Sequence, residues 1–233
     1  MNAVITGASK GLGKAIALAL AKKEINLFIT SRSESDLDKV KQELLAINPA
    51  IKVFYSPCDV SVKEQVNSLA KSILSVFREL DILINNAGVF LSGNIANELE
   101  SNLEIQMNTN LYSAYHLTRA LLPNILHKKS GHIINICSIA SIAPYPNGSS
   151  YCISKFALLG FSKCLREELK DSGIRVTSIL PGATWSDSWS GVDLPTDRLM
   201  QADDVAKVVV CAIELSPSAV LEEIILRPQL GDL

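Results

Sequence analysis

The chain has 233 residues, of which 48% are hydrophobic and 20% are charged, a balance typical of a globular protein with one large core. Its formal net charge of −2 excludes the basic field that draws proteins non-specifically to nucleic acid or anionic lipid. No apolar run in the sequence is long enough to span a membrane. We therefore expect a small-molecule partner, with no nucleic acid and no membrane.

The N-terminus and the cysteines bear on the compartment. An apolar segment begins at the second residue with no basic region before it, which argues against a cleavable signal peptide. The five cysteines are scattered, and neither they nor the three histidines have the spacing of a metal site. From this spacing we expect no bound metal. Because intracellular disulfides are rare, we also expect free thiols and a cytoplasmic location.

Short apolar segments rich in β-branched residues alternate with segments in which apolar residues recur every three or four positions. The first kind predicts buried strands covered on both faces, and the second predicts amphipathic helices. The predicted strands are 2–6, 25–30, 52–57, 81–86, 132–137, 175–180 and 222–227. The predicted helices are 12–23, 34–47, 62–78, 99–128, 150–172 and 203–215.

Strands that alternate with helices indicate right-handed crossovers and a parallel sheet. We predict an α/β fold, a doubly wound, Rossmann-like sheet of seven parallel strands with helices on both faces, in a single domain over 1–233. A long stretch without periodicity, 183–199, predicts a substrate lid within this domain. It holds both tryptophans, Trp185 and Trp189, which either line the substrate pocket or form one face of a short helix.

The first predicted strand runs directly into the sequence TGASKGLG, residues 6–13, and a predicted helix follows. Glycine lets the backbone approach a ligand closely, and the first N–H groups of a helix have no partner within it. The pattern predicts a phosphate site for a dinucleotide, although a tight turn without a ligand could use the same glycines. The expected cofactor contacts are Gly7, Ser9, Lys10, Gly11, Leu12 and Gly13.

Arg32 follows the second predicted strand, where the adenosine ribose of a bound dinucleotide is expected. An acidic side chain there would favour NAD(H), whereas a guanidinium pairs with a 2′-phosphate. Arg32 and Lys10 therefore favour NADP(H) over NAD(H), and the alternative for Arg32 is a solvated loop charge. Asp59 and Val60, after the third strand, are candidate adenine contacts or part of an exposed turn.

Further motifs follow in order along the chain. In addition to TGASKGLG, they are CDV at 58–60, NNAG at 85–88, Ser138, the pair Tyr151-x-x-x-Lys155, and Pro181-Gly182. Together they resemble the short-chain dehydrogenases/reductases of the compact type, over essentially the whole chain. The resemblance implies a homodimer or homotetramer, because the helices at 99–128 and 150–172 pair in dimers of similar proteins.

The pair at 151 and 155 suits hydride transfer to a carbonyl. Negative charge develops on the carbonyl oxygen, which needs a proton donor and a second hydrogen-bond donor, and Tyr151 and Ser138 fit these roles. A free phenol ionises too weakly at neutral pH to exchange protons readily, and a nearby ammonium stabilises the phenolate. Because residues four apart are neighbours on a helix, we expect Lys155 to tune Tyr151 as a general acid/base.

The resemblance implies further roles. Lys155 would also hold the nicotinamide ribose, and Asn110 would position a water that passes protons to Lys155. Asn108 is an alternative two residues away, and the sequence that follows favours Asn110. The remaining cofactor contacts that the resemblance implies are Asn86, Ala87, Gly88, Tyr151, Lys155, Pro181, Gly182 and Thr184.

These features predict an NADP(H)-dependent oxidoreductase that interconverts a ketone or aldehyde and an alcohol. One alternative is a redox-sensing nucleotide-binding module, which should lack the serine, tyrosine or lysine. Another is an epimerase or dehydratase of related fold, which should have a longer chain with a larger substrate domain. The substrate has no readable signature, although Ile139, Ala140, Ile142 and Tyr145 predict an apolar border that argues against a highly charged one.

Overall fold

Seven parallel strands form one sheet in the part of the chain that the computed structural model describes, residues 1–185, 191–195 and 197–232. The strands are β1 Asn2–Thr6, β2 Asn26–Ser31, β3 Val53–Pro57, β4 Ile82–Asn85, β5 Gly131–Ile136, β6 Ile174–Pro181 and β7 Glu223–Leu226. Their order in the sheet is β3-β2-β1-β4-β5-β6-β7. This confirms the predicted doubly wound α/β fold.

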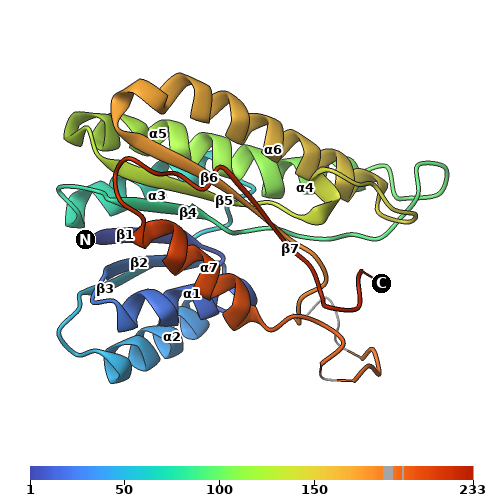
Figure 1. Ribbon diagram of the computed structural model, residues 1–233, viewed down its shortest axis with the longest axis horizontal. Coiled ribbons are helices and arrows are strands. Elements are labelled where there is room, and N and C mark those ends of the chain that lie inside the picture. Colours follow the sequence, from blue (N-terminus) through green and yellow to red (C-terminus); the bar gives the residue numbers. More distant parts are fainter. Residues whose placement is uncertain (186–190, 196, 233) are drawn as a thin grey trace.

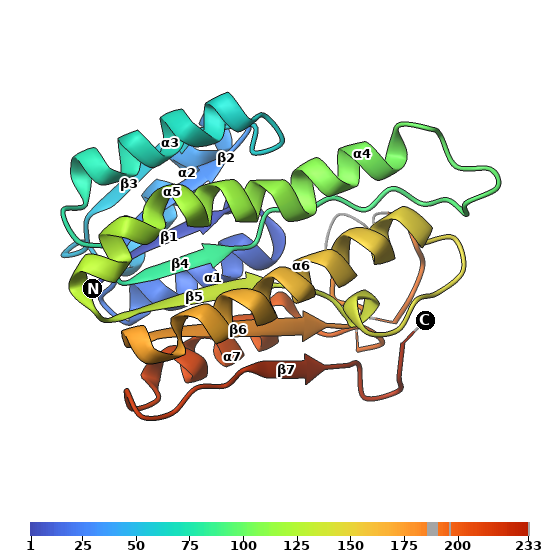
Figure 2. The same cartoon turned by 90° about the horizontal axis from the view of Figure 1, so that it is seen from above.

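The long helices form two layers, one on each face of the sheet (Figures 1 and 2). The α-helices are α1 Gly11–Lys22, α2 Glu34–Ile47, α3 Lys63–Val76, α4 Asn102–Met107, α5 Ser113–Lys128, α6 Ser149–Leu169 and α7 Ala202–Glu214. The other helical segments are the π-helix η1 Asn108–Tyr112 and the 3₁₀ turns η2 Ile139–Ser141 and η3 Lys170–Ser172. Helices α1, α2 and α7 lie on one face, and α3, α5 and α6 on the other.

Strand β1 shows why its sequence is almost continuously apolar. Val4 and Ile5 point to opposite faces, and neither has any exposed surface. Ile5 packs in the cluster that includes Ile16 of α1, whereas Val4 packs in the cluster that includes Ile73 of α3 and Leu121 of α5. Both faces of the strand therefore contribute to the hydrophobic core.

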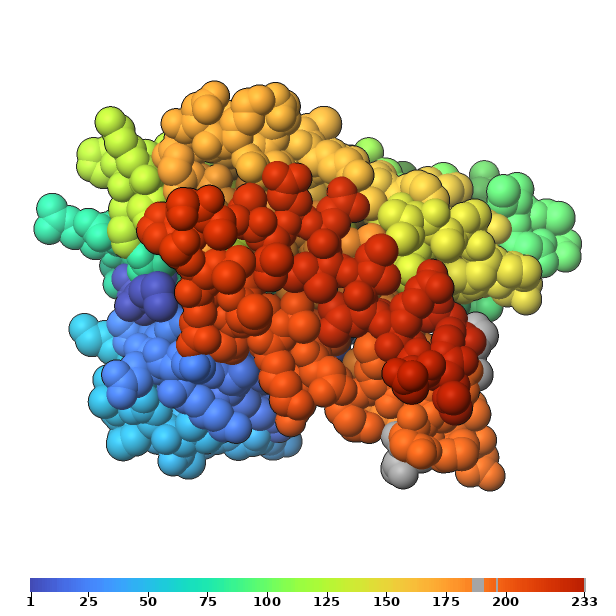
Figure 3. All heavy atoms as spheres, in the orientation of Figure 1, coloured from blue at the N-terminus to red at the C-terminus, as the bar shows by residue number. Residues whose placement is uncertain are grey.

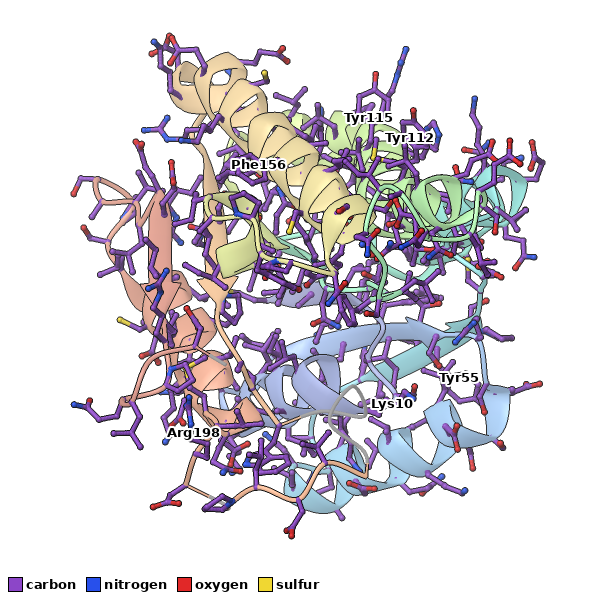
Figure 4. The ribbon with its side chains drawn as sticks, turned by 90° about the vertical axis from the view of Figure 1, so that its right-hand side faces the viewer. Lys10, Tyr55, Tyr112, Tyr115, Phe156 and Arg198 are labelled. Atoms are coloured by element: carbon purple, nitrogen blue, oxygen red, sulfur yellow. The ribbon has the colours of Figure 1, made fainter. Side chains whose placement is uncertain are left out.

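The order of the strands places the site. The chain winds from β1 through β2 to β3 on one side, and then returns to place β4 on the other side of β1. In a doubly wound sheet the ligand crevice lies outside the carboxyl ends of the strands at this reversal. Figure 4 faces that end of the molecule, with Lys10 near its centre.

The prediction of one continuous helix over 99–128 is wrong in two respects. The helical segment begins at Asn102, and the π-helix η1 interrupts it between α4 and α5. A π-turn inserts one residue into the helical repeat. Apolar spacing of three and four residues does not reveal it, because the register change is local and is stabilised by contacts outside the helix.

Within the described ranges, no helix is long and apolar enough to cross a membrane. The five cysteines all fall in those ranges and are free thiols. Within the same ranges, no three His, Cys, Asp or Glu side chains are grouped so that they could hold a metal ion.

Candidate active site

The glycine loop after β1 has the backbone shape of a phosphate cradle. Gly7 and Gly11 have φ angles of +65° and +53°, which side chains other than glycine rarely adopt. A Cβ on Gly13 would lie 2.3 Å from the carbonyl oxygen of Gly7, so the loop closes on itself only because that position has no side chain. Helix α1 begins here without a side-chain cap at Lys10 and without an acidic residue in its first turn. Its N-terminus therefore suits an anion.

The segment after β4 supports this loop. Thr6 Oγ1 accepts hydrogen bonds from the N–H groups of Asn86 and Ala87, both at 3.0 Å. The amide nitrogen of Asn86 donates to the carbonyls of Thr6 and Gly7, at 2.9 and 3.2 Å. Asn86 and Ala87 thus hold the end of β1 and the start of the loop together. This is a structural task in addition to the predicted cofactor contact.

Arg32 and Asp59 lie close enough to interact at the ends of β2 and β3. The hydroxyl of Ser61, 2.7 Å from Asp59 Oδ1, lowers the pKa of that carboxyl, and the positive charge of Arg32 lowers it further. Arg32 is exposed and Asp59 and Val60 are partly buried, so the predicted adenosine end of the site is open to solvent. The carboxylate of Asp59 also accepts a hydrogen bond from the N–H of Ser61, so both of these bonds stabilise the turn after β3.

Lys155 is buried beneath the carboxyl edge of the sheet. Only 4% of it is exposed, and Nζ donates a 2.9 Å hydrogen bond to the carbonyl of Ile136 at the end of β5. A Cβ on Gly88 would lie 3.6 Å from Nζ, an ordinary contact distance, so the glycine of NNAG lies next to the ammonium. Burial raises the pKa of the Cys137 thiol, and the charge of Lys155 opposes that shift. The Lys155 ammonium is therefore close enough to influence the residues that follow β5.

Tyr151 lies one turn before Lys155 on α6. The ammonium nitrogen is 5.8 Å from the centroid of the Tyr151 ring, and the ring is partly exposed. Ser138 follows β5, and its hydroxyl accepts a 3.1 Å hydrogen bond from the N–H of Ala140. Accepting this bond uses a lone pair and leaves the hydroxyl proton to be donated to a ligand. The structure thus gathers Ser138, Tyr151 and Lys155 at the end of β5 and the start of α6.

Asn110 lies in the π-helix η1 and is only 1% exposed, whereas Asn108 is partly exposed. Its Oδ1 accepts from the N–H of Val89 at 2.7 Å, and its Nδ2 donates to the carbonyl of Val89 at 3.0 Å. Nδ2 also donates to Ser154 Oγ at 2.9 Å. The side chain therefore ties η1 to the NNAG segment and to α6. Its predicted role in holding a water stays a prediction.

These features agree with the comparison of this chain with known proteins. The family described as short chain dehydrogenase matches residues 1–194. The chain belongs to this family.

Relatives of this short-chain dehydrogenase span its whole length. Sepiapterin reductase of Chlorobaculum tepidum is 35% identical over 238 residues, which cover 99% of this chain and 97% of the relative. The alcohol dehydrogenase of the archaeon Thermococcus sibiricus, solved with 5-hydroxy-NADP, is 29% identical with a TM-score of 0.93, covering 100% and 98% of the two chains. L-sorbose reductase of Gluconobacter frateurii, solved with NADPH and L-sorbose, is 27% identical with a TM-score of 0.89, covering 97% and 94%. The chain is therefore an oxidoreductase.

The turn after β6 is tied to the end of β7. The N–H of Gly182 donates to the carbonyl of Leu226 at 2.7 Å, and the buried hydroxyl of Thr184 donates to the carbonyl of Gly182 at 3.0 Å. Pro181 is the last residue of β6. These residues thus lie at the carboxyl edge of the dehydrogenase sheet, where the nicotinamide contact was predicted.

The predicted lid, 183–199, is described only in part, and Trp189 lies outside the described residues. Its base is held by two hydrogen bonds: the N–H of Trp185 donates to the carbonyl of Met200, and the N–H of Met200 to that of Ala183, at 2.9 and 3.1 Å. The assignment of a lid, and of the tryptophans to the pocket, stays a prediction.

The C-terminal residues pack against the end of this stretch. Arg198 donates to the carbonyls of Gly231 and Asp232, at 2.8 and 3.2 Å. Figure 3 shows the C-terminal residues in red beside the orange segment that follows β6. Arg198 therefore connects the loop over the carboxyl edge to the chain beyond β7.

Two residues near the site were missed in the sequence. Phe90 meets the Tyr151 ring edge-on, with centroids 5.2 Å apart and an interplanar angle of 90°. Gln106 has no exposed surface and pairs with the backbone of Leu91. The one available signal for Gln106 was its position four residues before Asn110, on the same helical face.

Proposed function

We propose that this short-chain dehydrogenase is an NADP(H)-dependent enzyme that interconverts a ketone or aldehyde and an alcohol, with Tyr151 as the general acid/base. The observation that carries the proposal is the burial of the Lys155 ammonium one helical turn from Tyr151, beside the end of a glycine-cradled crevice. Burying a cation costs free energy, so stability alone does not account for an ammonium at this position.

The residues present fit the cofactor. The cradle of Gly7, Gly11 and Gly13 with the uncapped N-terminus of α1 would hold its diphosphate, and Lys155 would hold the nicotinamide ribose. The other expected contacts are Ser9, Lys10, Leu12, Asp59, Val60, Asn86, Ala87, Gly88, Pro181, Gly182 and Thr184. The bound nicotinamide supplies the hydride.

Three side chains carry the rest of the chemistry. In reduction, the hydroxyl of Tyr151 gives its proton to the substrate oxygen as negative charge develops there, and Ser138 donates a hydrogen bond to the same oxygen. The ammonium of Lys155 stabilises the phenolate that Tyr151 becomes. Asn110 fixes η1 against the NNAG segment and would position the water that returns a proton. In oxidation the same groups act in reverse.

We favour NADP(H) over NAD(H) because of Arg32. The residue that follows β2 is this arginine and not an acid. Its side chain is exposed near Asp59, and it can pair with a 2′-phosphate. The solved relatives cited above were studied with 5-hydroxy-NADP or NADPH. This supports the same cofactor class here.

We also propose that the protein is a homodimer or homotetramer. Large apolar side chains are exposed on the outer face of α5, η1 and α6, including Tyr112, Tyr115 and Phe156 (Figure 4). Such side chains are usually covered in a partner interface. Sedimentation velocity is expected to give a species larger than the 25.2 kDa monomer.

The test is turnover of a carbonyl panel followed by the absorbance of NADPH. The panel should include a pterin ketone and a ketose, because the relatives are named for sepiapterin and L-sorbose. Tyr151→Phe, which removes one hydroxyl, is expected to lower kcat about 10²- to 10⁴-fold with little change in NADPH affinity. Tyr55→Phe removes the same hydroxyl on β3, the edge strand four places from β5 in the sheet, and as the matched control it should keep full activity. Full activity in Tyr151→Phe would overturn the mechanism, and NADPH binding without turnover of any carbonyl would overturn the function.

A further inference from the structure

The backbone after β4 runs along the catalytic pair and presents an aromatic ring to it. Gly88 lies against the Lys155 ammonium, and two residues later the ring of Phe90 stands perpendicular to that of Tyr151. Phe90 is 39% exposed although it is large and apolar. An apolar ring that is held in place but left uncovered beside a catalytic group is available to a ligand.

Two buried amides on α4 and η1 fix the residues on either side of Phe90. Asn110 exchanges two hydrogen bonds with the backbone of Val89, and Gln106 does the same with Leu91, accepting from its N–H at 3.0 Å and donating to its carbonyl at 3.4 Å. These four hydrogen bonds hold the backbone on both sides of Phe90. In this position the Phe90 ring meets the Tyr151 ring edge-on.

A second set of contacts joins this segment to the start of α6. The N–H of Gly93 donates to the carbonyl of Asn147 at 2.8 Å, and the carbonyl of Gly93 accepts from the N–H of Ser149 at 3.2 Å. Glu98 accepts a 2.6 Å hydrogen bond from the hydroxyl of Ser150, the residue before Tyr151. The segment that carries Phe90 is thus hydrogen-bonded to the start of α6, the helix that carries Tyr151.

A third aromatic residue borders the same place. Tyr145 is 40% exposed in the loop between η2 and α6, and Tyr151 is close enough to act on it electrostatically. Ile142, on the same loop, is 41% exposed. Two flat rings that are partly exposed, those of Phe90 and Tyr145, therefore lie near Tyr151. Aromatic rings gain more than their buried area when they pack with other flat, unsaturated groups.

We propose that Phe90 is a specificity-determining residue, positioned by Gln106 and Asn110, that selects substrates whose carbonyl carries a planar, unsaturated group. This inference rests on the proposed function, because it concerns the substrate of the same site. It assigns to Phe90 a contact with the substituent and leaves the proton transfer to Tyr151.

The test compares two aldehydes with the same number of carbon atoms, benzaldehyde and cyclohexanecarboxaldehyde, with NADPH as reductant. The measured quantity is the ratio of their kcat/KM values, so that intrinsic reactivity cancels between variants. Phe90→Leu is expected to lower this ratio about 2- to 12-fold, and Phe90→Tyr to retain it. Ile95→Ala changes a side chain of the same segment that is 78% exposed, and it should leave the ratio as in the wild type.

An equal loss for both aldehydes in Phe90→Leu, or no change, overturns the proposal. Binding of benzamide and cyclohexanecarboxamide to the protein saturated with NADP⁺, measured by calorimetry, asks the same question without turnover. Preference for benzamide that is lost in Phe90→Leu supports the proposal, and a wild type that shows no preference overturns it. A wild type that shows this binding preference but turns over no carbonyl of the panel would instead overturn the proposed function.

Discussion

Gly13→Ala adds one methyl group at the point where the glycine loop closes on itself. The new Cβ would lie 2.3 Å from the Gly7 carbonyl oxygen and 2.5 Å from Nδ2 of Asn86. Real Cβ contacts are essentially never closer than 3.0 Å, so the loop must open by about 0.7 Å. Overpacking of this kind costs about 1–3 kcal/mol. Because the loop is the proposed diphosphate cradle, we expect most of the cost to appear in cofactor binding rather than in folding.

A cost of this size corresponds to an increase of about 5- to 150-fold in the Kd for NADPH. The assay is calorimetric titration of NADPH into the purified protein, with the thermal midpoint measured in parallel. The matched control is Gly160→Ala on α6, where an added Cβ has nothing within 4 Å. It should leave the Kd unchanged and raise the stability by about 0.5–1 kcal/mol, because alanine favours a helix interior. A Gly13→Ala variant with wild-type Kd and wild-type thermal midpoint would refute the reasoning.

Two further changes test the adenosine end of the site and the buried core. Arg32→Ala is expected to reduce the preference for NADPH over NADH about tenfold, because it removes charge-assisted hydrogen bonds to a 2′-phosphate; an unchanged ratio of the two Kd values contradicts the assignment. Burial, with the charge of Arg175 adding to it, lowers the pKa of His132 to about 3, so the folded protein resists a proton that the unfolded chain accepts below about pH 6.5. This group therefore stabilises the fold fully above that pH and loses about 2 kcal/mol of its contribution by pH 5, and urea unfolding of His132→Asn should show an acid limb shallower by this amount. An identical pH dependence in the two proteins would show that His132 is not responsible.

Much of the fold was predictable because its signals are local. The buried strands are continuous apolar runs and the helices have a repeat of three and four residues, so each of the seven strands lies within one residue of its predicted bounds at either end. The parallel, doubly wound sheet was predicted from the alternation of strands and helices, whereas the order of the strands was not predicted. The interrupted helix at 102–128 was not predictable, because its π-turn depends on where Asn110 finds partners outside the helix.

The site also has some features that local sequence specifies and others that depend on tertiary packing. The sequence by itself determined that a glycine loop enters a helix and that Tyr151 and Lys155 share one helical face, since both depend on spacing along one segment. Only the tertiary structure decided that Gly88 lies against Lys155 and that Asn110 rather than Asn108 is buried.

The place of Phe90 depended on the tertiary structure most of all. Two amides, Gln106 and Asn110, bind the backbone of residues 15 and 21 positions earlier, on either side of the ring that meets Tyr151. A repeat along the chain specifies which face of a helix is buried. It does not specify which backbone groups that face will meet, because that depends on how the helix and the segment are packed on the sheet.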